Sequence, residues 1–436
     1  MRNRGSLLSR RALFAGTGGV LGLAAFRADA MARVAEAQRA AQGRTPAGLA
    51  ADETYWAQIG RAFDVDRTLV NLNNGGCSPA PAHVLDAMIR DLRFSNEIPV
   101  YHMWTLLEPR LESVRRELAA EFGCDPEEMA ITRNASESLE TLIFGIDLKA
   151  GDEVVVTNQN YPRMLTSWDQ RARRDGIVVK RISFPVPPKS AADVVERFRQ
   201  ALTPRTRVIE VTHITNLTGQ ILPVRDLVRL GRERNIEVFV DGAHAFAHFP
   251  FRRDDLDCDY YATSLHKWLF APIGTGFLYV RKGKQKSIWP LMAAPENMDE
   301  NVRKYEEIGT HPAANHNAIA VALAFHRGIG AERKAARLRL LRDRWAKPLA
   351  AADSRVRVLT PLNDTESCGI GLIHVDGIDT EKLQTHLWDK HRIMTTPIVH
   401  AEFNGLRITP NVYTTFDEID AFTDRMTRIV KAGLPA

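Results

Sequence analysis

Cysteine is scarce in this chain, which has four cysteines among its 436 residues. None of them stands in the close C-x-x-C spacing that is typical of zinc and iron–sulfur sites. We therefore expect no metal site. An oxidising compartment would permit disulfides, but nothing in this pattern requires them. The four cysteines are Cys77, Cys124, Cys258 and Cys368.

An excess of one charge is also missing from most of the chain. The formal net charge is +5, but residues 1–30 alone hold five arginines against a single acid, Asp29. The rest of the chain is nearly neutral and has no basic stripe interleaved with aromatic residues, so we expect no nucleic-acid partner. Hydrophobic residues make up 44% and charged residues 25%, which is the composition of a globular protein with a large core.

Long apolar runs are absent as well. No segment reaches the roughly 20 apolar residues of a transmembrane helix, so we expect no stable membrane span in the mature chain. The shorter run Ala15–Phe26 follows the pair Arg10-Arg11, and Ala28-Asp29-Ala30 offers a small-residue cleavage site. Residues 1–30 thus resemble a twin-arginine export signal, which implies the twin-arginine export machinery as a partner and a periplasmic or secreted protein exported in the folded state. An ordinary signal peptide and an uncleaved anchor are the alternatives.

Short β-branched runs alternate with helical stretches in the middle of the chain. The expected strands are 153–157, 177–182, 206–212, 236–240 and 276–281, and the helices between them are 162–174, 191–201 and 224–234. This alternation predicts an α/β fold with a mostly parallel sheet flanked by helices. The strand 276–281 is expected to be antiparallel.

The pattern divides the chain into four parts. After the leader 1–30, we expect a helical or flexible lead-in over 31–68 and a large domain over 69–330, with one helix at 107–122. Two long helices over 313–352 lead into residues 331–436, a linker helix and a smaller α+β C-terminal domain. The strands expected there are 370–375, 392–397 and 406–409, followed by a helix at 417–431.

One strand ends in an acid, Asp241, that precedes a lysine, Lys267, by 26 residues. The lysine closes the sequence Ser264-Leu265-His266-Lys267 and is followed by the glycine-rich PIGTGF. A lysine amine forms a Schiff base with the aldehyde of pyridoxal 5'-phosphate, and an aspartate paired with its pyridinium nitrogen keeps the ring an electron sink. Ser264 and His266 can donate hydrogen bonds to the phosphate. A surface lysine and a strand-end aspartate are the alternatives, but the ordered set favours the cofactor site.

Other candidates follow the expected strands, at the sheet edge where ligands of open α/β folds gather. Asn134, Ala135 and Ser136 precede a helix, and their N–H groups and the serine hydroxyl can hold a phosphate; a plain helix cap is the alternative. Tyr161 can stack on the pyridine ring or simply pack at the domain edge. Asn216 can donate to the ring hydroxyl or belong to an ordinary turn.

Arg407 lies in the third strand of the small domain, within GLRITPNVY. The fixed charge and forked donors of arginine suit an amino-acid α-carboxylate. A structural salt bridge is the alternative. The sequence thus predicts a small, amino-acid-like substrate.

These residues, in this order, resemble class V of the fold-type I pyridoxal phosphate enzymes and, within it, the isopenicillin N epimerase-like proteins. The matching stretches span residues 70 to about 413. They are LNNGGCSP, TRNASESLET, THITNLTGQILPV, VDGAHAF, SLHKWLFAPIGTGFLYV, EEIGTHP and GLRITPNVY. The resemblance implies a large pyridoxal phosphate-binding domain and a small C-terminal domain.

The resemblance also assigns roles by position. Lys267 becomes the Schiff-base lysine and the proton carrier at Cα, and Asp241 the partner of the pyridinium, with His244 as its neighbour at the ring. Thr310 resembles the segment that reaches the phosphate of a second subunit, which implies a homodimer with shared active sites. Asn74 approaches the substrate. Phosphate binding falls to Ala135, Ser136, Ser264 and His266, and substrate carboxylate binding to Arg407.

Several reactions use the same cofactor and the same set of site residues. Epimerisation or racemisation at Cα is our first expectation, with Tyr161, His244 or the partner subunit's Tyr101 as candidates for a second acid. Transamination and β- or γ-elimination are alternatives, and so is a secreted binding protein that keeps the fold without turnover. Sulfur mobilisation is disfavoured because Cys368 stands 39 residues before Arg407, whereas desulfurases place their cysteine shortly before that arginine.

Overall fold

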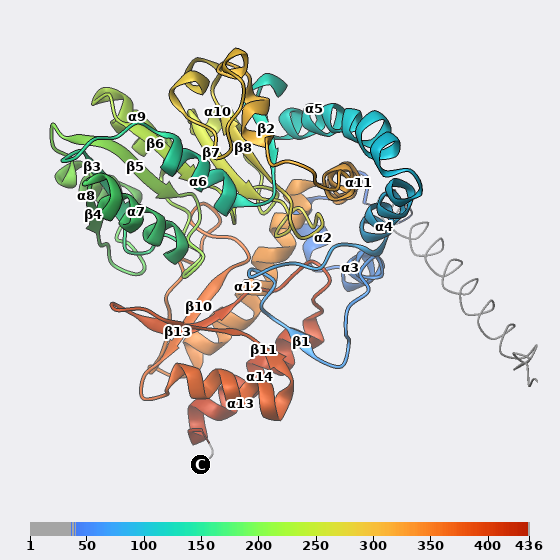
Figure 1. Ribbon diagram of the computed structural model, residues 1–436. Helices are drawn as coiled ribbons and strands as arrows, with labels where there is room; N and C mark the ends of the chain where they lie inside the picture. Colours follow the sequence, from blue (N-terminus) through green and yellow to red (C-terminus); the bar gives the residue numbers. More distant parts are fainter. Residues whose placement is uncertain (1–35, 37–38, 40, 435–436) are drawn as a thin grey trace, which may run out of the picture.

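The computed structural model describes residues 36, 39 and 41–434. The expected export signal over 1–30 lies outside these residues. Within the described part of the chain, no helix is both long and apolar enough to cross a membrane. Figure 1 shows a large domain built around a sheet, with a smaller domain below it that ends near the C-terminus.

The large domain is organised by a seven-stranded sheet in the order β2-β8-β7-β6-β5-β3-β4. The five strands from β7 to β4 run parallel, while β8 is antiparallel to both of its neighbours. The expected mostly parallel sheet is therefore confirmed, as is the antiparallel strand near its edge. The strands are β2 (Met129–Thr132), β3 (Glu153–Thr157), β4 (Val178–Ile182), β5 (Thr206–Thr212), β6 (Glu237–Asp241), β7 (Tyr260–Ser264) and β8 (Gly276–Val280).

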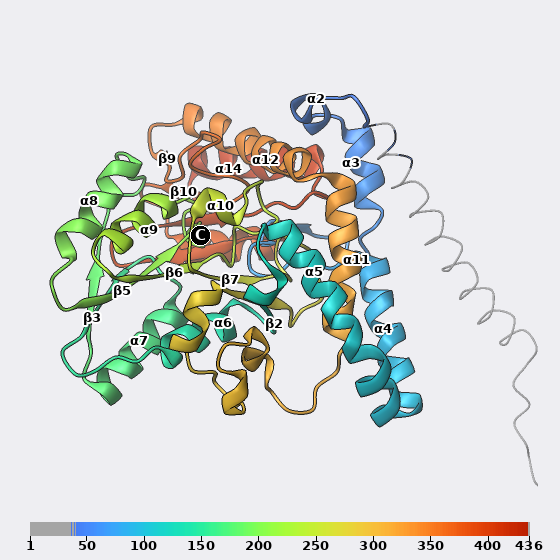
Figure 2. The same ribbon diagram turned by 90° about the horizontal axis from the view of Figure 1, so that it is seen from above.

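Helices cover both faces of this sheet (Figure 2). Consecutive valines of β3 point to opposite faces: Val155 packs in one core with β5 and β6, while Val154 and Val156 pack in another with α6 and α7. A strand that is apolar at every position is typical of a sheet buried on both sides. The helices of this domain are α4 (Ala82–Glu97), α5 (Leu111–Phe122), α6 (Ala135–Gly145), α7 (Pro162–Asp175), α8 (Ala191–Ala201), α9 (Val224–Glu233), α10 (Arg253–Leu256) and α11 (Ala314–Ile329).

The small domain carries a four-stranded sheet in the order β12-β13-β10-β9. The long helix α12 (Ala331–Ala352) leads into it, and its apolar face packs with α13 and α14 against that sheet. The other elements are β9 (Val356–Val358), β10 (Gly371–Val375), α13 (Thr380–His391), β11 (Ile393–Met394), β12 (Thr396–Val399), β13 (Asn404–Ile408) and α14 (Phe416–Ala432).

The described part of the lead-in contains two short helices, α2 (Pro46–Ala50) and α3 (Glu53–Gly60), joined and flanked by turns and loops. It packs in one apolar cluster with α12 and with Tyr413. The next segment was expected in the large domain, but β1 (Val70–Asn71) pairs in parallel with β11 of the small domain. Backbone pairing, which apolar spacing does not reveal, therefore joins the residues after Leu69 to the C-terminal part of the chain.

Other expected boundaries also need correction. The helix predicted over 107–122 is three elements: a π-helix η1 (Val100–Leu107), a 3₁₀ turn η2 (Glu108–Arg110) around Pro109, and α5. The strand predicted over 392–397 is split into β11 and β12, which belong to different sheets. Strands β2, β7 and β9 were not predicted. Short 3₁₀ segments complete the structure: η3 (Pro126–Glu128), η4 (Lys282–Ser287), η5 (Glu296–Met298) and η6 (Val302–Glu306).

One buried arginine holds the lead-in in place. Arg337 of α12 donates to the carbonyl oxygens of Ala50 (3.0 Å) and Thr414 (2.9 Å) and forms an ion pair with Glu53. We expect Arg337→Met to lower the free energy of unfolding by about 2–3 kcal/mol, because two buried carbonyls lose their donor. Urea denaturation measures this, and limited proteolysis should then cut within residues 41–63.

Arg229→Met is the matched control. Arg229 pairs with Asp226 on the exposed face of α9, and breaking such a pair changes stability by less than about 1 kcal/mol. Equal losses in the two variants would contradict the anchoring role of Arg337.

Candidate active site

The carboxyl ends of the parallel strands meet around a cavity of about 180 Å³. Ten of the residues predicted from the sequence line it, contributed by loops that are far apart along the chain. They are Asn134, Ala135, Ser136, Tyr161, Asn216, Asp241, His244, Ser264, His266 and Lys267. Gly76, Leu139, Thr212 and Ala243 complete the lining. The position of the cavity follows the general rule for ligand sites in open α/β sheets.

Lys267 lies in the turn that follows β7, and its Nζ is 2.9 Å from Nε2 of His244. Burial lowers the pKa of Lys267 to about 8, although the negative charge of Asp241 opposes this shift. The nearby guanidinium of Arg407 lowers the pKa of Lys267 further. Near physiological pH a much larger share of this amine is therefore neutral and nucleophilic than of an ordinary exposed lysine.

Asp241 is the last residue of β6 and is 3% exposed. Its Oδ1 accepts the N–H of Ala243 at 2.9 Å, while burial raises the pKa of the carboxyl. The next residue must be glycine, because a Cβ on Gly242 would lie 2.0 Å from the ring of Tyr261. The packing of Gly242 on this ring thus fixes the backbone directly after the aspartate, and a cationic ring nitrogen would give the buried carboxyl of Asp241 a partner.

The N-terminus of α6 forms one wall of the cavity. Asn134 caps this helix, accepting the N–H of Glu137 at 2.9 Å, so the helix-cap alternative is observed for Asn134. The N–H of Ala135 donates to Oγ of Ser264 at 3.0 Å, which leaves the serine proton free to donate. Ser136 lies in the first helical turn, where backbone dipoles favour an anion.

His266 faces the same wall. Its Nδ1 donates to the carbonyl oxygen of Thr275 at 3.2 Å, and burial lowers its pKa to about 4. The neutral ring therefore carries one N–H proton, and that proton is used in the hydrogen bond to the carbonyl oxygen of Thr275. In this orientation Nε2 is an acceptor, so a hydrogen bond from His266 to a phosphate requires its ring to leave Thr275 or to gain a proton.

Arg407 of β13 is 6% exposed and donates to the carbonyl oxygen of Asn216 (2.8 Å) and to Oδ1 of Asn73 (3.0 Å). Its Nε has no partner, and among the described residues no carboxylate forms an ion pair with it. Burial lowers its pKa to about 10. The salt-bridge alternative is not observed, and a buried cation without a counter-ion is a site for an anionic ligand.

Several buried polar atoms at the cavity lack a protein partner. Oγ1 of Thr212 and Oδ1 of Asn216 are buried and have no hydrogen-bond partner in the part of the chain that the structure describes, and both residues line the cavity. Buried polar groups are almost always hydrogen-bonded, so such atoms mark places where a ligand completes the structure. The unpaired atoms, the buried acid, the lysine and the helix N-terminus fit the polar groups of pyridoxal 5'-phosphate.

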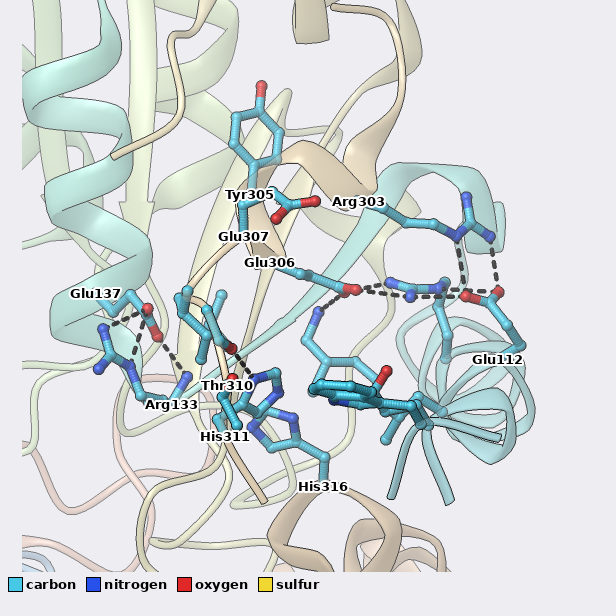
Figure 3. Close-up of a pocket in the computed structure, with 18 residues that line it drawn as sticks. Glu112, Arg133, Glu137, Arg303, Tyr305, Glu306, Glu307, Thr310, His311 and His316 are labelled. Atoms are coloured by element: carbon cyan, nitrogen blue, oxygen red, sulfur yellow. Dashed lines mark hydrogen bonds and ion pairs between the residues drawn. The ribbon is translucent and has the colours of Figure 1, made fainter. Parts of the chain in front are cut away.

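Three predicted residues are not part of the cavity lining: Asn74, Thr310 and Arg407. The charge of Arg407 still acts on Lys267. Asn74 is fully buried, and its amide is already bonded to the carbonyls of Asn71 and Thr409 and to the hydroxyl of Tyr413. Thr310 is exposed and lines a different pocket of about 500 Å³, shown in Figure 3. The structure brings Asn73 to the site in place of Asn74. The two adjacent asparagines mark this segment in the sequence as a candidate for the site. They do not indicate which asparagine contacts Arg407.

The low pKa of Lys267 gives a chemical test that needs no cofactor. In competitive labelling of the cofactor-free protein with acetic anhydride, we expect the labelling of Lys267 to reach half its maximum near pH 8. Below that pH the amine is protonated and unreactive, whereas exposed lysines need a pH above about 10. Peptide mass spectrometry reads each site. A midpoint for Lys267 equal to that of Lys347, an exposed lysine on α12, would contradict the burial argument.

Comparison with known proteins identifies the family of this chain. The family model described as aminotransferase class-V matches residues 70–422. The isopenicillin N epimerase of Amycolatopsis lactamdurans is 30% identical over 398 residues, which cover 87% of this chain and 99% of that protein. The isopenicillin N epimerase of Streptomyces clavuligerus is 29% identical and covers 85% of this chain and 97% of its own.

Solved structures support the architecture. The cysteine desulfurase of Thermococcus onnurineus NA1 superposes with a TM-score of 0.74 at 22% identity and covers 86% of this chain and 98% of its own. The cystine C–S lyase C-DES gives a TM-score of 0.72 at 22% identity. At such identities the likeness shows the fold alone, and it confirms the expected fold-type I arrangement. With a family match over most of its length, this chain belongs to the class V aminotransferases, and it is an enzyme whose cofactor is pyridoxal 5'-phosphate.

Proposed function

We propose that this enzyme inverts the configuration at the α-carbon of a small amino-acid-like substrate, as an epimerase or racemase. One observation carries the proposal: relatives named isopenicillin N epimerase align over 85–87% of this chain and 97–99% of their own length. Relatives named cysteine desulfurase align over less of the chain, 59% for the probable enzyme of Synechocystis and 74% for that of Haloferax volcanii. The substrate side chain is left open by this argument.

Arg407 supports an amino-acid substrate. Among the described residues its guanidinium has no carboxylate partner, and Asn73 and the Asn216 carbonyl fix its orientation. A substrate carboxylate bound there in a bidentate manner would supply the missing counter-ion and orient the α-carbon toward Lys267. The cofactor, when bound, supplies an electron sink that makes the α-proton acidic. Lys267 then removes or returns that proton, since about half of its amine is neutral at pH 8.

Inversion needs a second proton donor on the opposite side of the α-carbon. His244 contacts Lys267 directly, at 2.9 Å, so it shares the lysine side of the cavity. Tyr161 also lines the cavity, comes from a different loop, and remains 40% exposed. Within a single chain, Tyr161 is therefore our candidate for the second acid.

Sulfur mobilisation has little support in the packing. Cys368 is fully buried in an apolar cluster, its Sγ is 3.6 Å from the carbonyl oxygen of His248, and burial raises its pKa to about 11. A persulfide-forming thiol must ionise and reach the substrate. Transamination and elimination differ from inversion only in where the proton or leaving group goes, and they yield keto acids.

A D₂O experiment tests the proposal. The cofactor-loaded enzyme is incubated with a panel of L-amino acids, including ones extended through an amide on the side chain, that all keep a free amine and a free carboxylate on the α-carbon. Chiral chromatography with mass spectrometry follows that carbon. We expect deuterated product of both configurations. Tyr161→Phe should slow inversion by about 100-fold, because a general acid contributes at least that much, while exchange with retention continues through Lys267.

Tyr101→Phe is the matched control. Tyr101 is 52% exposed on η1 and does not line the cavity of its own chain. Loss of inversion in this variant alone would assign the second acid to the partner subunit's Tyr101. Stoichiometric keto acid from the wild-type enzyme would contradict the epimerase proposal.

We further propose a homodimer with shared active sites, supported by the segment that carries Thr310. Two ion pairs hold this segment on the surface: Arg303 donates to both carboxylate oxygens of Glu112 (2.9 and 2.7 Å), and Arg115 donates to Glu306 (2.9 Å). Figure 3 shows these pairs on one side of the pocket and the exposed Thr310 on the other. The ion pairs hold the segment rigidly, and the hydroxyl of Thr310 is exposed. Thr310 is therefore placed to contact a second subunit.

Mixed dimers test this arrangement. Thr310→Ala should weaken cofactor affinity about tenfold, the cost of one hydrogen bond to a charged group. A dimer of one Thr310→Ala chain and one Lys267→Ala chain should regain one site of full affinity, measured by fluorescence titration. The pair Lys267→Ala with Asp241→Asn is the control and should regain none, because both residues serve the same chain's cavity. No recovery in the first pair would exclude sharing through Thr310.

A further inference from the structure

A second row of buried groups lies behind the cavity, starting from Trp268. This residue directly follows the lysine and is fully buried. Its indole N–H donates to Nδ1 of His244 at 3.4 Å. An indole nitrogen can only donate, so Nδ1 of His244 must carry a lone pair there. Burial lowers the pKa of His244 well below its ordinary value, so the ring is neutral and its single proton must sit on Nε2.

The neighbouring histidine is oriented in the same unambiguous way. The backbone N–H of Gly369 donates to Nε2 of His248 at 2.9 Å, and Nδ1 of His248 donates to the carbonyl oxygen of His244 at 2.8 Å. The His248 ring stacks flat on Trp268, with centroids 3.6 Å apart and an interplanar angle of 0°. This stack fixes the plane of the indole and hence the direction of its N–H.

A buried lysine fixes the backbone of the same turn. Nζ of Lys334, on α12, donates to the carbonyl oxygen of Trp268 and lies 3.8 Å from the ring centroid of Phe270. Phe270 adopts a left-handed backbone with φ of 64°, which a bulky residue keeps only when its surroundings hold it. The turn from Lys267 to Phe270 is therefore held by its backbone as well as by its rings.

The proton on Nε2 of His244 points at Nζ of Lys267, 2.9 Å away. A donor at this position is satisfied only if the lysine accepts, which a neutral amine does and an ammonium cannot do. We propose that Trp268 is a positioning residue that fixes His244 as the Nε2–H tautomer and thereby holds Lys267 as the free amine. The inference concerns the lysine that all reactions of this family use, and it does not depend on the inversion proposed above.

Other charged groups also face this pair, and their effects are separable. Asp241 on β6 and Cys77 favour the ammonium form of Lys267, whereas Arg407 on β13 disfavours it. Around His244, the other titratable neighbours besides Lys267 and Arg407 are His248 and His266. A substitution of Trp268 by another aromatic residue removes none of these charged groups and leaves a ring for His248 to stack on, so its main effect falls on the tautomer of His244.

The tautomer can be observed directly. Nitrogen-15 NMR of the full chain labelled at histidine distinguishes protonated from unprotonated ring nitrogens, and His244→Gln assigns the signal. We expect His244 to show a protonated Nε2 and an unprotonated Nδ1, both in cofactor-free and in cofactor-loaded protein. A protonated Nδ1 in the wild-type chain would overturn the proposal.

Trp268→Phe then tests the consequence, because it keeps a ring for His248 but removes the donor. His244 is then free to change tautomer, and the pH at which acetylation of Lys267 is half-maximal should rise by about one unit. At pH 7 this corresponds to about tenfold slower labelling of Lys267. Trp345→Phe is the matched control, since the buried indole N–H of Trp345 has no partner. An unchanged midpoint in Trp268→Phe, or equal shifts in both variants, would refute the role. Should Trp268→Phe fail to fold, the NMR result on the native chain decides alone.

Discussion

Lys267 places an amine inside a cavity whose wall includes one carboxylate, Asp241. The like charge of Arg407 acts on this amine from outside the lining. None of the three is neutralised by a direct ion pair among the described residues. In a medium of low dielectric such charges are costly, and each shifts its proton equilibrium in response. The ends of the strands bring these charged groups close together. A bound ligand could neutralise them, because a cationic ring nitrogen would pair with the carboxylate and anionic groups would pair with the cations.

The small domain contributes to this set of buried charges. Arg407 comes from β13, yet one of its partners, Asn216, follows β5 of the large domain and another, Asn73, follows β1. The guanidinium therefore lies where three distant parts of the chain meet. Gly369, at the start of the small domain's sheet, orients His248 behind the lysine. Substrate binding and lysine chemistry are thus connected to the same packing of one domain on the other.

Much of this arrangement was predictable because its signals are local. The valines of β3 show a strand buried on both faces, and the Asp-Gly and His-Lys pairs mark the ends of β6 and β7. Strand β7 itself was missed, since Tyr260-Tyr261-Ala262-Thr263-Ser264 mixes aromatic, small and polar residues without alternation. The choice between Asn73 and Asn74 depends on the bridge that pairs Asn73 with Thr409, more than 300 positions away. The role of Trp268 depends on the direction of a side chain, which spacing does not encode.

The pairing of the N-terminal and C-terminal parts of the chain has a consequence for biosynthesis. Gly75 is bonded to Thr409, and Ser78 to the carbonyl of His266. The wall of the cavity next to Gly76 is therefore complete only after residues near Thr409 have been synthesised and have paired with this segment, and the lead-in likewise packs only once Tyr413 is present. Domains generally fold as units once their residues have emerged. A protein that holds its cofactor in a complete cavity has therefore already joined residues 73–78 to residues near 409.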